Sequence, residues 1–149
     1  MKRSFPFLIS VIALFVFSSS TAFAGAQVRV RIIEASHAGT GVDPVLEDVH
    51  AELGSLFSFN SYKLLREINV DLVGNRMVDV PVHPGRSIEL TLVGEYKRLI
   101  ELRIKMIREG ATVLNTNVRL APGRTILIGG PRHGGATPGT LIFAVSARF

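Results

Sequence analysis

From residue 60 onward, the chain consists of short segments in which apolar and polar residues alternate, separated by turns rich in Gly and Pro. Alternation puts every second side chain on the same face of an extended strand, so one face can be buried while the other meets water. Short strands at regular spacing, joined by such turns, are typical of an antiparallel sandwich or a small barrel. The alternating segments span residues 62–73, 77–82, 87–93, 99–107, 112–120, 125–128 and 141–149.

One further strand and one helix are predicted before this series. Residues 27–35 alternate, with Arg on the polar face, and Asp43-Pro44 provides an N-cap followed by Pro at the first helical position. We therefore expect a helix over about 43–57, with Asp48 and its other polar residues facing solvent and its apolar side chains packed on one sheet or over one end. The apolar stripe consists of Leu46, Val49, Leu53 and Leu56 or Phe57.

The first 24 residues have the anatomy of a cleaved secretory signal. Lys2 and Arg3 precede an apolar run, and Ala22-Phe23-Ala24 matches the A-x-A cleavage pattern, so cleavage is expected after Ala24 or after Ala26. The chain contains no Cys, so the exported part is held by burial rather than by disulfides. These features predict a periplasmic protein, with the outer membrane as the alternative location.

The remaining residues, 25–149, suit a single domain with one core. The predicted fold is mainly β, of the α+β type. It has one strand, one amphipathic helix, and then an antiparallel β-sandwich of about six to seven strands.

The charged residues argue against nucleic acid as a partner. Removal of Lys2 and Arg3 from the 17 basic residues leaves 15 against 12 acidic ones, a net charge of +3. Most of the 15 are Arg, and they occur singly along the chain, whereas a nucleic-acid-binding domain concentrates basic residues on one face. The dispersed Arg residues are expected on the solvent faces of strands. So small an excess of positive charge does not favour membrane association either.

One glycine-rich segment near the C-terminus looks at first like a ligand loop. A phosphate-binding loop leads from a strand through glycines into a helix, but here the alternation of residues 141–149 predicts a following strand. We therefore predict a hairpin loop of about twelve residues, from Gly129 to Thr140. Because long loops often carry binding function, partner contacts are assigned to this loop. The predicted contact residues are Arg132 and His133, with the flanking Gly129, Gly130, Gly134 and Gly135.

No residue pattern points to catalysis, to a metal or to a cofactor. The four His residues lack the spacing that places two imidazoles on one metal ion. Ser36, His37 and Asp43 supply the residue types of a hydrolase triad, but adjacent side chains of an extended segment point to opposite faces. The chain is expected to be non-enzymatic and free of cofactors, and a hydrolase with an unrecognised site is the alternative.

The last strand leaves a further alternative open. Leu141, Phe143, Val145, Ala147 and Phe149 share one face, and a terminal aromatic after alternating apolar positions is also found in the closing strand of outer-membrane barrels. Several predicted strands are shorter than the roughly 9–11 residues that a membrane strand needs. A small outer-membrane β-barrel ending in Phe149 therefore stands second to the periplasmic domain.

Two turns share a Pro-Gly centre, at Pro84-Gly85 and at Pro122-Gly123. Pro supplies a fixed φ and Gly a positive φ, which are the values that a type II turn needs at its two central positions. Each turn is therefore expected to join an antiparallel pair of strands.

Residues 115–131, NTNVRLAPGRTILIGGP, resemble a segment of the bacterial secretin family, the outer-membrane gates of type II secretion and related machines. In that family a strand and a turn with Gly lead to a second strand that runs into Gly-Gly, as the strands around Gly123 do here before Gly129-Gly130. Residues 141–145 are similar to the apolar strand that follows in that family. The resemblance, over 115–145, implies a small β-domain exported to the envelope and associated with such machinery.

The sequence therefore predicts a binding or interaction domain of the cell envelope whose partner is another envelope protein. It would act through the loop that carries Arg132 and His133, or by pairing an open sheet edge with a strand of the partner.

Overall fold

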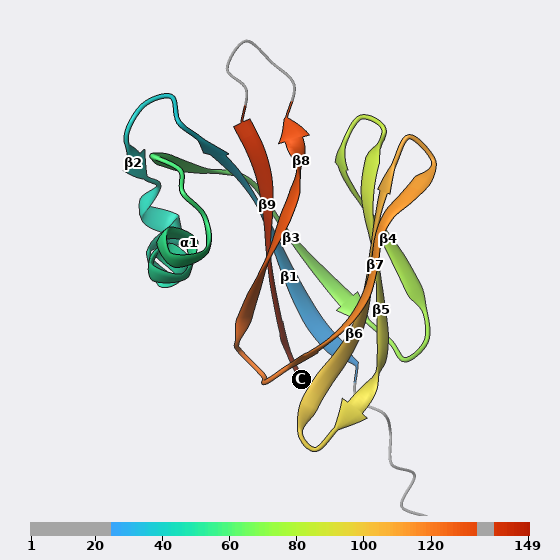
Figure 1. Ribbon diagram of the computed structural model, residues 1–149. Coiled ribbons are helices and arrows are strands. Elements are labelled where there is room, and N and C mark those ends of the chain that lie inside the picture. The colour runs from blue at the N-terminus through green and yellow to red at the C-terminus, as the bar shows by residue number, and fades with distance from the viewer. Residues whose placement is uncertain (1–24, 134–138) are drawn as a thin grey trace, which may run out of the picture.

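The computed structural model describes residues 25–133 and 139–149, which form two packed β-sheets with a helical segment beside one of them (Figure 1). The larger sheet has five strands in the order β2-β3-β1-β9-β8, and the smaller has four in the order β4-β5-β6-β7. Seven strands follow the helical segment, so the predicted mainly β fold is confirmed. The strands are β1 (Ala26–Ser36), β2 (Gly41–Val42), β3 (Ser61–Leu72), β4 (Met77–His83), β5 (Arg86–Tyr96), β6 (Leu99–Arg108), β7 (Ala111–Leu120), β8 (Thr125–His133) and β9 (Gly139–Arg148).

The space between the sheets is filled by the side chains that alternation predicts on one face of each strand. In β9, Leu141, Phe143, Val145 and Ala147 are at most 2% exposed, whereas Phe149 lies beyond the strand and is 49% exposed. Burial of such side chains removes apolar surface from water, which is the main force that holds the two layers together. The other strands contribute Val28, Val30, Ile32, Ile88, Leu90, Leu92, Ile100, Leu102 and Ile104 to the same core.

A second core lies between the outer face of the larger sheet and the helical segment. This segment begins as the 3₁₀ helix η1 (Pro44–Val49) and continues as α1 (His50–Leu56). The predicted N-cap is confirmed, because the Asp43 carboxylate accepts a hydrogen bond from the N–H of Val45. Where the helical segment covers the sheet, strands β1 and β9 are therefore buried on both faces. The second core is made of Ile33, Ala35, Ile142 and Ala144 from the sheet and Leu46, Val49 and Leu53 from the helical segment.

The predicted apolar stripe is wrong at Leu56, which is 64% exposed. The first half of the segment has three residues per turn instead of 3.6, so the stripe rotates relative to that of a continuous α-helix. The chain then leaves α1 at Phe57 with extended backbone angles. Phe57, which was the other candidate for this position, packs against the second core.

The two Pro-Gly turns have the expected backbone but different roles. Gly85 and Gly123 both have positive φ, at 73° and 81°. The first turn joins the antiparallel pair β4 and β5, as predicted. The second does not close a pair: it carries the chain from β7 in the smaller sheet to β8 in the larger one, and its Gly123 N–H donates to the Ala147 carbonyl. A four-residue turn fixes the local change of direction, but the strand that receives the chain is chosen by packing of the two layers.

The predicted signal, residues 1–24, lies outside the described residues. Ala26 is 1% exposed and pairs with Leu72, so the predicted cleavage after Ala24 retains this buried residue whereas cleavage after Ala26 removes it. Within residues 25–133 and 139–149, none of the helical segments has the length and apolar character needed to cross a membrane.

Candidate interaction edge

The glycine-rich segment is mostly strand rather than loop. Gly129, Gly130, Arg132 and His133 lie in β8, which pairs with β9 through His133, and the connection shortens to residues 134–138. The predicted hairpin is confirmed, but its twelve-residue loop is wrong. Arg132 is exposed at the end of this strand, and the predicted contact residues Gly134 and Gly135 lie outside the described residues.

The glycines of β8 serve packing. A Cβ on Gly130 would lie 2.5 Å from a ring carbon of Phe143 and 2.9 Å from the Leu141 carbonyl oxygen. A Cβ on Gly129 would lie 3.3 Å from the ring of Phe57. The missing side chains thus make room for two aromatic rings on opposite faces of the strand, which explains Gly-Gly without a ligand.

The residue types of a hydrolase triad do not form a hydrogen-bonded set. The Ser36 hydroxyl donates to the carbonyl of Ala38 at 3.0 Å, and the His37 ring packs at 4.9 Å, between ring centroids, from Phe59. Asp43 is the helix cap described above. Among the residues that the structure describes, no group of three or more His, Asp or Glu side chains is placed to hold a metal ion.

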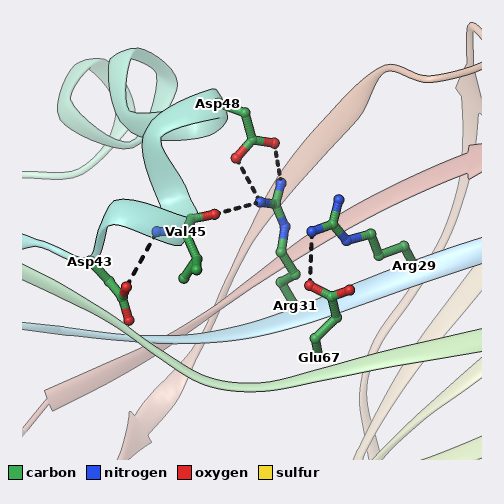
Figure 2. Close-up of polar contacts among 6 residues, drawn as sticks. All are labelled: Arg29, Arg31, Asp43, Val45, Asp48 and Glu67. Carbon is green, nitrogen blue, oxygen red and sulfur yellow. Dashed lines mark hydrogen bonds and ion pairs between the residues drawn. The ribbon is translucent and has the colours of Figure 1, made fainter.

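An ion pair with a buried cation fastens the helical segment to the larger sheet (Figure 2). Arg31 of β1 lies beneath η1 and donates from Nη1 and Nη2 to the two carboxylate oxygens of Asp48, at 2.7 and 2.8 Å. Nη1 also donates to the Val45 carbonyl at 3.4 Å. The Arg31 side chain is 2% exposed and that of Asp48 is 55% exposed, so Asp48 closes the mouth of the site in which Arg31 is buried.

One prediction fails at this pair. Arg31 was expected on a solvent face and is buried, whereas Asp48 is exposed as expected and its carboxylate is bound to Arg31. The alternation of β1 is correct, but the helical segment covers part of the polar face, and that coverage is a property of the tertiary structure. The hydrogen bonds from Arg31, and the positive charge of that group, lower the pKa of the Asp48 carboxyl below its ordinary value.

The uncovered part of the same sheet face is a polar groove of about 600 Å³. Within it Arg29 donates to Glu67 at 2.8 Å, and Arg148 donates to the side chain of Gln27 at 3.3 Å. The Arg29 guanidinium lowers the pKa of the Glu67 carboxyl. Arg29 and Glu67 neutralise each other, Arg148 is bound to a neutral amide, and Asp71 also lines the groove, so charges of both signs lie together there.

A second groove, of about 630 Å³, lies at the β4–β5 turn and is lined by Arg66, His83 and Arg86. Arg66 donates to the Pro81 carbonyl. The Nη1 atom of Arg86 is buried without a hydrogen-bond partner. In the described part of the chain, no other buried side-chain nitrogen or oxygen lacks one. Because this Arg86 nitrogen is buried, it is turned away from a ligand in the groove.

Three of the four sheet edges are protected against pairing with another chain. Pro81 removes a donor from β4 and a bulge follows it, whereas the Gly-Gly-Pro run interrupts the register of β8 between Gly129 and Arg132. The N-terminal end of β3 pairs with β2, and the Asp43 carboxylate accepts from the N–H of Leu64. The rest of this edge has no strand partner, but it carries the charged residues Arg66, Glu67 and Asp71, which also discourage pairing. Pro, bulges and covering segments are the devices by which natural sheets avoid edge-to-edge association.

The edge of β7 has none of these devices over most of its length. A bulge at Val113 marks its start, and from Leu114 to Leu120 it pairs with β6 without a break. It contains no Pro, and Arg119 is its only charged residue. Within residues 25–133 and 139–149, no strand or side chain is hydrogen-bonded to its other side. Alternate residues of β7 therefore point their N–H and C=O groups toward solvent in a row.

No protein family, no curated protein and no solved structure matches this chain. Its binding properties are therefore to be sought in its own surface. Among the described surfaces, the β7 edge combines a long uninterrupted row of free backbone groups with the fewest protecting features, because the row of equal length on β3 carries three charged residues and that on β7 carries one. The sequence predicted an open edge but not which strand forms it, because strand order is set by packing of the two layers.

Proposed function

We propose that this protein is an exported, non-enzymatic binding domain of the bacterial cell envelope that associates with another envelope protein through the β7 edge. The observation that carries the proposal is the bare edge from Leu114 to Leu120, in a molecule whose other three edges are protected. Export is supported by the signal-like residues 1–24.

Strand addition explains how such an edge binds. The partner contributes an extended segment whose backbone continues the β4-β5-β6-β7 sheet, and the main-chain hydrogen bonds supply affinity. Specificity comes from side chains on the two faces of β7. Asn115 and Asn117 are exposed on the outer face, whereas Leu114 and Val118 are half-buried on the inner face, where a partner side chain can cover them.

The resemblance of residues 115–145 to secretins starts within this strand. On that basis the envelope partner is a component of a secretion machine, and the protein is an accessory of it. This assignment rests on the resemblance, whereas the edge contact rests on the geometry of β7.

The test combines cell fractionation with a photo-cross-linking residue. The full-length chain, expressed in a bacterium with an outer membrane, carries p-benzoylphenylalanine in place of Val113, which is 54% exposed beside the edge. The matched control carries it in place of Val45, which is 55% exposed on η1. We expect recovery in the periplasmic extract and a discrete cross-linked band for Val113 only. Equal bands at both positions, no band at Val113, or a carbonate-resistant membrane fraction would overturn the proposal.

A further inference from the structure

The regular part of the β7 edge reads nearly the same in both chain directions. Residues 114–118 are Leu-Asn-Thr-Asn-Val, with Thr116 at the centre, Asn on either side of it, and a branched apolar residue at each end. Their exposure follows the same symmetry, since Leu114, Thr116 and Val118 are half-buried while Asn115 and Asn117 are exposed.

When two such strands pair antiparallel about a two-fold axis, residues of the same type lie opposite each other. With the axis at Thr116, each copy's Asn115 lies opposite Asn117 of the other, and Leu114 lies opposite Val118. Thr–Thr pairs and pairs of apolar residues are favourable when they face each other across antiparallel strands. A two-fold contact also uses the same patch on both molecules, so it closes after two copies and leaves no open end.

The charges of the neighbouring strand fit this arrangement. On the outer face, Arg103 donates from Nε to Asn117 at 3.2 Å, and Lys105 is the register partner of Asn115. Across the axis the row becomes Arg103, Asn117, Asn115 and Lys105, so two neutral side chains separate the cations of the two copies. A cation at either Asn position would lie directly beside one of these groups, and β7 has none there.

We propose that the segment received by the β7 edge is the β7 edge of a second copy of this chain, paired two-fold at Thr116, so that the two four-stranded sheets become one of eight strands. This inference rests on the part of the proposed function that assigns binding by strand addition to the β7 edge, and it puts a second copy of this chain there in place of a different envelope protein. Pairing satisfies the outward backbone groups of both strands at once and covers Leu114 and Val118 of each copy.

Oligomeric state is the first test, with the chain lacking residues 1–24 in sedimentation equilibrium over a dilution series. The variant Asn115→Glu/Asn117→Glu places Glu opposite Glu across the axis, whereas within its own sheet each Glu lies beside Lys105 or Arg103. It should therefore fold and yet dissociate, with the dimer dissociation constant raised at least about tenfold. Asn115→Gln/Asn117→Gln, the neutral control, should remain dimeric.

Register is the second test, and it uses the absence of native Cys. A disulfide needs Cα atoms closer than about 7 Å, which holds for directly opposed residues and not for residues displaced by two positions. Under a mild oxidant Thr116→Cys should cross-link to itself. Asn115→Cys and Asn117→Cys should each fail alone and cross-link when mixed.

The outcomes separate the two proposals. A dimer with this cross-linking pattern supports the inference, and efficient self-linking of Asn115→Cys or Asn117→Cys overturns its register. A chain that stays monomeric throughout the dilution series overturns the inference itself. In that case a Val113 photo-cross-link to a protein of different mass leaves the proposed function standing, and the absence of any such band removes both.

Discussion

Replacement of Asp48 by Asn tests how the helical segment is held to the larger sheet. Asn keeps the shape of Asp and one acceptor oxygen, but it removes the charge and the acceptor for one of the two short hydrogen bonds from Arg31, 2.7 and 2.8 Å. The guanidinium stays where it is, with a side chain that is 2% exposed. Asp48→Asn thus leaves a buried cation without its counter-charge.

The magnitude follows from the burial of the two partners. Removal of one partner from a fully buried pair costs about 3–5 kcal/mol. Here the carboxylate side is 55% exposed, so water reaches the vacated position and the loss should be smaller, about 2 kcal/mol. For a domain of this size, that corresponds to a fall in Tm of roughly 6–10 °C.

Urea unfolding followed by circular dichroism measures this loss, and two variants make it diagnostic. Arg31→Met replaces the buried cation by an apolar side chain, so it should cost less than Asp48→Asn, and the double variant should be no worse than Arg31→Met. Glu67→Gln breaks the exposed pair with Arg29 and should cost less than about 1 kcal/mol. If Arg31→Met is more destabilising than Asp48→Asn, and the double variant is less stable than either single variant, then an uncompensated buried cation is not the cause of the stability lost in Asp48→Asn.

Three further predictions concern pH and packing. Arg31 lowers the pKa of Asp48 in the folded state, so the ion pair stabilises the fold fully above the unfolded pKa of about 4. That stabilisation is lost as the pH falls through the lower, folded-state pKa. The free energy of unfolding should therefore fall more steeply with acid in the wild type than in Asp48→Asn. Leu53→Ala should cost about 2–5 kcal/mol in urea unfolding, since this fully buried side chain anchors α1, and an unchanged midpoint would contradict the second core. Gly130→Ala should lower Tm through its clash with Phe143, whereas Gly54→Ala, in α1 with open space around it, should raise stability by up to about 1 kcal/mol; a reversed order would refute the packing role of Gly130.

Local pattern carries much of the fold. Side-chain period identifies the strands, because an extended chain turns every second residue to the same side whatever lies next to it. The inward faces of β5, β6 and β9 were therefore predictable residue by residue, as was the start of the helical segment at Asp43. The open edge was also expected in general terms, since a sheet that does not close on itself has two edges.

The identity of that edge depends on contacts between distant segments. The same Pro-Gly turn closes a hairpin at Gly85 and crosses between the sheets at Gly123, and nothing in the four turn residues distinguishes the two cases. Because β7 and β8 part at this crossing, the backbone of β7 is left without a second partner. The near-symmetry of residues 114–118 can be seen in the sequence. It suggests a two-fold contact only once the structure shows that this strand has an unpaired edge.

Local residue patterns set which side chains alternate between the two faces of a strand and where the helical segment begins. Contacts between distant segments set the half-covered polar face of β1, so that Arg31 is buried and Asp48 becomes its partner. They also set the packing of the β8 glycines against aromatic rings and the place of β7 at an edge. The physical reason is the same in each case: alternation is a property of one strand, whereas coverage of a face or an edge requires a second element brought to it by packing.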